Sequence, residues 1–264
     1  MTNTPSPLHY TCTGSGPDVL LIHGWGSSGV MWGPTMQALA GQFRLWAVDL
    51  AGSGASQPYE GVSGINRHVE ALAAFCERHQ IKPLAVVGHS MGGMVALKLA
   101  AMYPDLMQGL VLVCPCITGR YGFPGMSRFF RTRWTTPLTA RSQLLWRIAK
   151  HELVVQAATH LLFHPNRPLL MQIVRDFQRA DWRSGVHDLH SMARENVLEA
   201  ARQIRIPTLV IVGGRDRTVP PDEGRAAAFA IPKARLVEFP TCAHRLPDER
   251  PEAFFATLQN FLTR

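Results

Sequence analysis

The chain has 264 residues, of which 46% are hydrophobic and 17% charged, so it can bury one large core. Met1 to Gly16 lacks a basic segment followed by an apolar run. No stretch elsewhere reaches the roughly 18 apolar residues that a membrane helix needs. Five cysteines, an odd number in a chain of this size, fit reduced thiols. We therefore expect a soluble, cytoplasmic protein without a signal peptide, a membrane span or a disulfide framework.

The net charge of +8 is concentrated in one part of the chain. Residues 117–183 hold 11 of the 27 Lys and Arg but only 3 of the 19 Asp and Glu, so the remainder is balanced. A protein that follows a phosphate backbone usually also carries a recognisable binding module, and no such motif stands in this sequence. We therefore do not expect nucleic-acid binding.

Short apolar or β-branched runs that end in turn signals predict six strands. In chain order these are residues 18–22, 44–48, 84–87, 110–113, 208–212 and 235–239. Helical patterns fall between them, at residues 66–79, 91–102, 221–230 and 251–262. Several strands are apolar on consecutive residues, which is typical of a parallel sheet covered on both faces. The alternation predicts an α/β fold with a mostly parallel sheet flanked by helices.

The alternation is interrupted between residues 115 and 205, where helical patterns continue without a convincing strand. Proline and glycine punctuate this segment at Pro124, Pro137, Pro165, Pro168 and Gly185. We expect three or four helices here, forming a cap (115–205) inserted into a core made of residues 1–114 and 206–264. The cap mixes basic and aromatic residues with apolar helix faces. This composition fits either simple packing on the core or an apolar pocket beneath a basic outer surface.

The residues after the third predicted strand match the pattern Gly-x-Ser-x-Gly, as Gly88-His-Ser-Met-Gly92. A strand precedes this turn and a helix follows it, which is the context that a nucleophilic serine requires. Glycine at both outer positions avoids a collision of side chains with the strand and the helix. Ser90 is therefore the predicted nucleophile, and the backbone N–H of Met91 a predicted oxyanion donor. We interpret His89 as a packing side chain.

The loop after the first predicted strand contains Gly24-Trp-Gly-Ser-Ser-Gly29, and the backbone N–H of Trp25 is the predicted second oxyanion donor. The same residues match the dinucleotide pattern Gly-x-Gly-x-x-Gly, and Asp49 has the spacing of a ribose-binding acid. A dinucleotide site needs a helix that begins within the glycines, however, and Gly33-Pro34 should break that helix. We therefore assign Asp49 to the turn that continues to Ser56.

A catalytic serine of this kind needs a carboxylate and then a histidine, from loops that follow later strands. Residues 111–119 contain no Asp or Glu, whereas Asp216 lies in a glycine-supported turn after the next strand. His244 is the only histidine after His190. We therefore predict that Asp216 orients His244, which acts as general base toward Ser90, so that an acyl-enzyme forms.

Other histidines and cysteines could in principle bind metal. His160 and His164, and His187 and His190, are spaced to share a helix face. Neither pair has an identifiable third ligand, and Cys114-Pro-Cys116 is better explained as a strand end. We expect neither a metal nor a cofactor.

Taken together, His23-Gly24, Asp49 to Ser56, Gly88 to Gly93, Gly213 to Asp216 and His244 resemble the capped α/β-hydrolase superfamily over nearly the whole chain. His23-Gly-Trp-Gly26, followed by Trp32, resembles the pimeloyl-carrier methyl ester esterases in particular. The resemblance implies the same nucleophile, acid, base and oxyanion donors. The sequence departs from those esterases at two positions, with Ala243 for the usual Gly and His89 for the usual Trp.

Hydrolysis of a small carboxylic ester is the expected function. Three alternatives remain open on the same fold and triad: carbon–carbon bond hydrolysis, cofactor-free perhydrolysis, and a ligand-binding receptor without catalytic activity. The basic cap adds a possible partner, an acidic acyl carrier protein.

Overall fold

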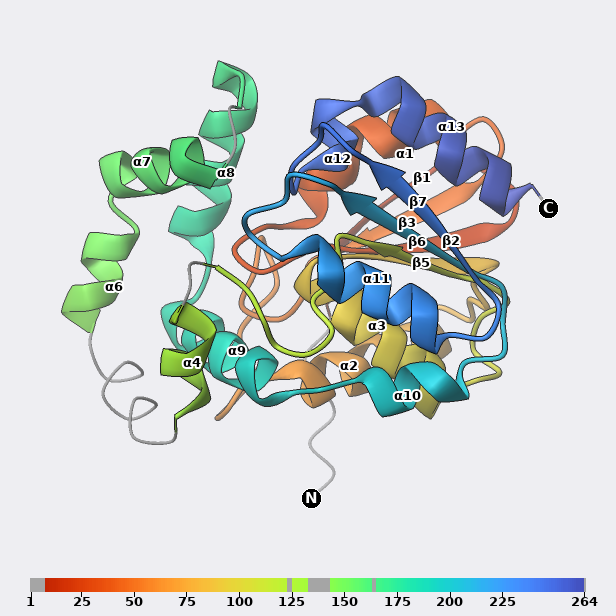
Figure 1. Cartoon of the computed structure of the whole chain (residues 1–264), viewed down its shortest axis with the longest axis horizontal. Helices are drawn as coiled ribbons and strands as arrows, with labels where there is room; N and C mark the ends of the chain where they lie inside the picture. The colour runs from red at the N-terminus through yellow and green to blue at the C-terminus, as the bar shows by residue number, and fades with distance from the viewer. Residues whose placement is uncertain (1–7, 123–124, 133–142, 163–164, 264) are drawn as a thin grey trace.

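The computed structural model describes residues 8–122, 125–132, 143–162 and 165–263, and these form a seven-stranded sheet (Figure 1). The order across the sheet is β1-β3-β2-β4-β5-β6-β7, and only β1 runs antiparallel to its neighbour. The strands are β1 (Tyr10–Thr13), β2 (Asp18–Ile22), β3 (Arg44–Val48), β4 (Ala85–His89), β5 (Leu110–Val113), β6 (Thr208–Gly213) and β7 (Ala234–Phe239). The predicted α/β fold with a mostly parallel sheet is confirmed.

All six predicted strands are present, with ends that differ by at most two residues. The sequence pattern did not predict β1, a four-residue edge strand whose side chains are largely exposed. Its sequence, Tyr-Thr-Cys-Thr, contains no apolar run, because β1 is an edge strand held by its pairing with β3 and by the ring contacts of Tyr10 with Trp46 and Phe75.

Helices cover both faces of the sheet (Figure 1). One face carries α2 (Ile65–Arg78), α3 (Met91–Met102), α10 (Leu198–Gln203) and α11 (Pro221–Ala230), and the other carries α1 (Gly33–Leu39), α12 (Leu246–Glu249) and α13 (Pro251–Leu262). Successive side chains of a strand point to opposite faces. Leu20 and Ile22 of β2 accordingly enter the core cluster under α2 and α3, whereas Val19 and Leu21 enter the cluster under α1 and α13. The continuous apolar strand sequences thus serve two cores.

The predicted break at Gly33-Pro34 was wrong, because α1 begins there. A 3-10 turn (Gly29–Trp32) leads into the helix, and Pro34 occupies its first turn. A first-turn proline costs no hydrogen bond, since the N–H that it lacks would have no partner inside the helix. The helix nevertheless begins after the last glycine of the loop, not within the glycines as a dinucleotide site requires.

Between β5 and β6 the described residues form helices only. They are α4 (Met126–Arg131), α6 (Gln143–Ala149), α7 (Glu152–Leu162), α8 (Arg167–Arg179), α9 (Trp182–Arg194) and α10. The predicted number of three or four was therefore too low, since these are six helices within the described part alone. Pro124 and Pro137 lie outside the described residues. Gly185 does not end a helix but lies inside α9.

The inserted helices differ in what they contact. α6, α7, α8 and α9 lie beyond the carboxyl ends of the strands, whereas α10 packs against α3 and α11 of the core (Figure 1). Two caps start helices in this segment: Asn166 accepts a hydrogen bond from Leu169 N in α8, and Asp181 accepts one from Ser184 N in α9. The division into core and cap at residues 115 and 205 stays a prediction. None of the described helices has the length and apolar content needed to cross a membrane.

Candidate active site

The carboxyl ends of β2 and β4 are neighbours, and the chain leaves them in opposite directions. After β2 it runs to α1 on one face of the sheet, and after β4 it runs to α3 on the other. In an open α/β sheet, the crevice at such a point is where ligands bind. The loop after β2 contains Trp25, and the turn after β4 contains Ser90. The topology therefore brings two of the predicted site residues to one crevice.

Ser90 occupies the single residue between β4 and α3, and its φ of 56° and ψ of −118° fall outside the allowed regions for side-chain-bearing residues. Such a conformation costs free energy of about 1–3 kcal/mol and persists only where surrounding structure enforces it. Here Ser90 N donates to Val113 O (2.9 Å), and Ser90 O accepts from Cys116 N (3.2 Å). The neighbouring strand end thus clamps the turn on both sides of the serine.

Gly88 and Gly92 make this turn possible. A Cβ at Gly88 would lie 2.2 Å from Gly92 O, and a Cβ at Gly92 would lie 2.4 Å from His23 O. Both distances are too short for real atoms, and the contacting atoms are backbone. The predicted steric reason for glycine on either side of Ser90 is confirmed.

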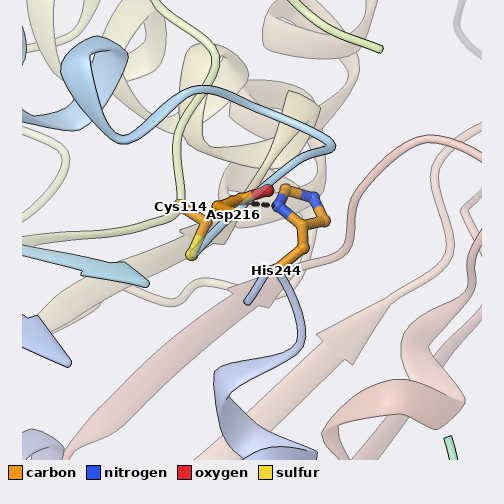
Figure 2. A group of neighbouring side chains, drawn as sticks. All are labelled: Cys114, Asp216 and His244. Carbon is orange, nitrogen blue, oxygen red and sulfur yellow. Dashed lines mark hydrogen bonds and ion pairs between the residues drawn. The ribbon is translucent and has the colours of Figure 1, made fainter. Parts of the chain in front are cut away.

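Asp216 and His244 form a buried hydrogen-bonded pair, drawn in Figure 2. The distance from His244 Nδ1 to Asp216 Oδ2 is 2.6 Å, and both residues are less than one-tenth exposed. Asp216 Oδ1 accepts from the backbone N–H groups of Thr218 (2.8 Å) and Val219 (2.9 Å). Because Asp216 accepts from Nδ1–H, His244 keeps its Nε2 available as a proton acceptor. Among the described residues, neither His244 Nε2 nor Ser90 Oγ has a hydrogen-bond partner.

Cys114 lies beside this pair, and the three side chains offer ligand atoms within 4.8 Å of one another (Figure 2). A cation would need the thiolate form of Cys114, but burial raises the pKa of this thiol well above its usual value, and the neighbouring Asp216 raises it further. Asp216 already accepts three hydrogen bonds. The donor set therefore favours an Asp–His pair with a neutral thiol beside it over a metal centre.

His89 packs against His244. Their ring centroids are 4.6 Å apart, and His89 Nε2 donates to the backbone oxygen of His244 (2.9 Å). Burial, and then the proximity of His244, hold the pKa of His89 well below its usual value. A neutral imidazole with its proton on Nε2 fits these contacts. The sequence predicted a packing role for His89 but did not indicate its hydrogen bond to the backbone oxygen of His244.

The predicted oxyanion donors are the backbone N–H groups of Trp25 and Met91. Neither has an acceptor among the residues that the structure describes. Met91 is the first residue of α3, where N–H groups point out of the helix end. Trp25 lies in the loop between β2 and the 3-10 turn, and its indole Nε1 donates to Gly185 O of α9 (2.8 Å).

Further contacts hold the Gly24–Gly29 loop. Ser28 Oγ donates to Asp176 Oδ1 of α8 (2.9 Å), and burial raises the pKa of that carboxyl. Asp49 Oδ1 accepts from Gly29 N (2.7 Å), while its Oδ2 accepts from Ala55 N (2.9 Å) and contacts His9 Nδ1 (2.9 Å). Both oxygens of the buried Asp49 are therefore used inside the protein. Asp49 belongs to the turn, as predicted, and cannot bind a ribose.

A small cavity lies between this loop and the inserted helices. Its lining includes Trp25 and Met91 from the core, and Trp146, Gly185 and Asp188 from α6 and α9. Gly185 allows the close approach, since a Cβ there would lie 3.0 Å from the Trp146 ring. This explains why the glycine stands inside a helix. Asp188 is a buried acid that no sequence motif singled out.

The predicted histidine pairs do not form metal sites in the described residues. His187 Nδ1 accepts from Ser63 N (3.4 Å), whereas His190 Nδ1 donates to Phe130 O (2.6 Å). They therefore bind different segments instead of sharing a ligand. His164, the partner proposed for His160, lies outside the described residues.

Comparison with known proteins places the chain in a family. The profile of the family described as alpha/beta hydrolase fold matches residues 17–251. The chain belongs to this family. A pimeloyl-[acyl-carrier protein] methyl ester esterase of Nitrosomonas europaea is 29% identical over 262 residues, covering 94% of this chain and 96% of that protein. The protein of the same name from Vibrio cholerae is 28% identical over 259 residues, 97% of this chain and 98% of that one.

A thermophilic esterase from Thermogutta terrifontis has a similar structure, with a TM-score of 0.78 and 27% identity over 97% of this chain and 93% of that chain. With the family shown and esterases among its relatives, the prediction of a carboxylic ester hydrolase of the α/β-hydrolase fold is confirmed.

Proposed function

We propose that the α/β-hydrolase cleaves its ester through Ser90, with His244 as general base and Asp216 as the acid that orients the histidine. The observation that carries the proposal is the fixed geometry of the pair: two backbone donors hold Asp216 Oδ1, so Oδ2 is aimed at His244 Nδ1 at 2.6 Å. On the nucleophile side, the strained turn presents Ser90 at the end of β4.

The reaction follows from these positions. His244 Nε2 takes the proton of Ser90 as Oγ attacks the ester carbonyl, and the carbonyl oxygen becomes an oxyanion. The free N–H groups of Trp25 and Met91 donate to that oxyanion. His244 then gives its proton to the departing alcohol, which leaves the acyl group on Ser90. Water, activated by the same imidazole, releases the acid and restores the serine.

The segment 115–205 acts as the predicted cap in this proposal, with an apolar wall beside the reacting atoms. The rings of Trp25 and Phe177 lie 5.2 Å apart, and those of Trp146 and Phe177 are stacked at 5.4 Å. Aromatic surfaces of this kind take up the hydrocarbon part of an ester. Because Trp25 supplies both an oxyanion donor and part of this wall, substrate fit and oxyanion geometry are coupled.

An acidic acyl carrier protein is the proposed partner, and two observations support it. The relatives named above act, by their names, on an ester linked to an acyl-carrier protein. The basic excess of this chain lies in the cap, where opposite charge would speed encounter with an acidic carrier. Not every cap cation is available, however. Arg131 donates to Ala193 O (3.0 Å) and Lys150 to Ala180 O (2.6 Å). Exposed Arg147, Arg167 and Arg175 are the better docking candidates.

We retain a cytoplasmic location as part of the proposal, because all five cysteines are free thiols in the structure.

Arg133, another cation of the basic segment 117–183, lies outside the described residues.

A fluorophosphonate probe with Ser90→Ala tests the proposed nucleophile. The wild-type protein should be labelled and should hydrolyse a short p-nitrophenyl ester, and the variant should lose labelling and several orders of magnitude of kcat. Ser15→Ala is the control, since Ser15 is exposed in the loop between β1 and β2, away from the turn that holds Ser90. Labelling or turnover that persists in Ser90→Ala, with an unchanged circular dichroism spectrum, would refute the assignment.

A further inference from the structure

Asp188 of α9 is a buried carboxylate that the ester-hydrolysis mechanism does not use, although it lines the same cavity as Trp25 and Met91. Asp188 is 4% exposed. It lies three residues after Gly185, on the face of α9 that meets the loop carrying the oxyanion donor. A carboxylate at this depth is costly unless its oxygens are hydrogen-bonded.

Only one of the two oxygens of Asp188 is bonded within the protein. Oδ1 accepts from Ser63 Oγ (2.6 Å) and contacts His68 Nε2 (3.1 Å). His68 is fully buried, and its other nitrogen lies 3.2 Å from the Tyr59 hydroxyl. These contacts fix the direction of the carboxylate, while no described residue donates to Oδ2. A residue of α9 that lines the cavity therefore carries a preorganised acceptor with no partner among the described residues.

A second polar atom of the cavity wall is also unsatisfied. Trp146 of α6 lines the cavity, and its indole Nε1 is buried without a hydrogen-bond partner among the described residues. A buried indole N–H without an acceptor loses its hydration and gains nothing in return. Two residues of the cavity lining thus carry an unbonded polar atom, an acceptor on Asp188 and a donor on Trp146.

We propose that this cavity is a substrate subsite for a small neutral group that both donates and accepts a hydrogen bond, such as a hydroxyl. The inference rests on the proposed ester hydrolysis and specifies the class of ester. Oδ2 of Asp188 accepts from the group, and Trp146 Nε1 donates to it. A hydrocarbon chain in the same place leaves both protein groups unpaired, which is the strongest basis on which binding sites reject an analogue. A carboxylate substituent is repelled by Asp188.

The test compares three methyl esters that differ at one carbon, which carries a hydroxyl, a keto oxygen or only hydrogen. Methyl hexanoate and its hydroxy and keto derivatives, with the substituent moved along the chain, provide the series. Hydroxyalkyl and alkyl acetates probe the alcohol side. At the best position, the wild type should prefer the hydroxy ester over the hydrocarbon ester by at least about tenfold in kcat/KM, as a hydrogen bond to a charged group provides.

Two conservative variants separate the subsite from a purely structural role of Asp188. In Asp188→Asn the amide oxygen stays with Ser63 and His68, so the amide nitrogen faces the cavity as a donor. Preference should then shift from the hydroxy ester to the keto ester by about tenfold. Trp146→Phe keeps the ring packing but removes the N–H, and should lower the rates of both substituted esters about fivefold relative to the hydrocarbon ester.

Ser63→Ala is the control, because it removes one of the two contacts of Oδ1 but keeps that of His68, and it leaves Oδ2 a carboxylate oxygen that can accept. A role of Asp188 confined to anchoring α9 predicts that Asp188→Asn and Ser63→Ala lower all three esters equally, and this result would overturn the subsite. Wild-type rates within twofold of each other at every position would overturn it as well. Failure of the proposed function itself is distinct, since no ester would then turn over and no fluorophosphonate would react.

Discussion

Substitution of Asp216 by Asn tests the orientation of His244, the proposed catalytic base. The amide has nearly the same shape as the carboxylate, but its oxygen and its nitrogen are not equivalent. One of them must face the backbone N–H groups and the other must face His244. Two backbone N–H groups, of Thr218 and Val219, point at Oδ1 from 2.8 and 2.9 Å. Placing the amide nitrogen there would leave two buried donors unpaired, at about 1–3 kcal/mol each. The amide oxygen therefore stays at Oδ1, and the nitrogen faces His244.

The consequence falls on the histidine tautomer. A donor now faces Nδ1 at the position where the carboxylate oxygen lay 2.6 Å away. The imidazole meets this donor by moving its proton from Nδ1 to Nε2, so that Nδ1 accepts. Nε2 then carries a proton and cannot take one from Ser90. A loss of turnover on the order of 10⁴-fold is expected, which corresponds to about 5.5 kcal/mol of transition-state stabilisation.

The assay is kcat for a p-nitrophenyl ester, measured together with thermal unfolding. Asp222→Asn is the matched control, since Asp222 also follows β6 but is exposed and pairs only with Arg225 on the surface. The control should retain wild-type turnover. A folded Asp216→Asn enzyme with more than about one-tenth of wild-type kcat would refute the argument, because that loss is far smaller than a wrong tautomer produces.

Two further predictions follow from charge. Changing exposed Arg147, Arg167 and Arg175 to Ser should lower kcat/KM for a carrier-linked ester but not for a small neutral ester. Added salt should have the same selective effect on the wild-type enzyme, and equal behaviour of the two esters would exclude carrier docking. Burial lowers the pKa of His89, so the unfolded chain binds a proton near pH 6.5 that the folded chain refuses. The free energy of unfolding should therefore fall as the pH drops below about 6.5. When it is measured by urea unfolding at several pH values, its slope against pH should be smaller in His89→Gln than in the wild type by about 1.4 kcal/mol per pH unit, and an unchanged slope would contradict this.

The sheet and the glycine turn around Ser90 could be predicted because their sequence signals are local. Each central strand is an apolar run that must be buried on both faces, and no alternative structure hides such a run as well. Gly88 and Gly92 are required by backbone contacts within a few residues of Ser90 or from the adjacent strand. Asp216 and His244 could be proposed because strand order leaves few loops at the carboxyl edge. Their bonding distance, by contrast, depends on Thr218 and Val219, whose role no pattern reveals.

The inserted helices were harder to predict because their important contacts are polar and distant in sequence. Asp188 meets Ser63 and His68 across more than 100 residues, and Gly185 meets Trp25 across 160. An isolated aspartate or glycine in a helical pattern carries no signal of such a partner. Gly185 even favoured a wrong prediction, because a glycine in a helical pattern usually marks the end of a helix.

One face of α9 contacts the loops after β2 and β3 and the start of α2, and the spacing of its contacts is helical. Asp181 N donates to Gly52 O (2.7 Å), Gly185 O accepts from Trp25, Asp188 bonds to Ser63, and Ser191 Oγ accepts from Ile65 N (3.0 Å). These positions recur every three to four residues. The loop that carries the proposed oxyanion donor is thus held by α9 through the Trp25 indole, whereas Ser90 is held by β5. A displacement of α9 would therefore move the side of the site where we propose that the oxyanion and the substrate group bind, while leaving Ser90, the proposed nucleophile, fixed in the sheet.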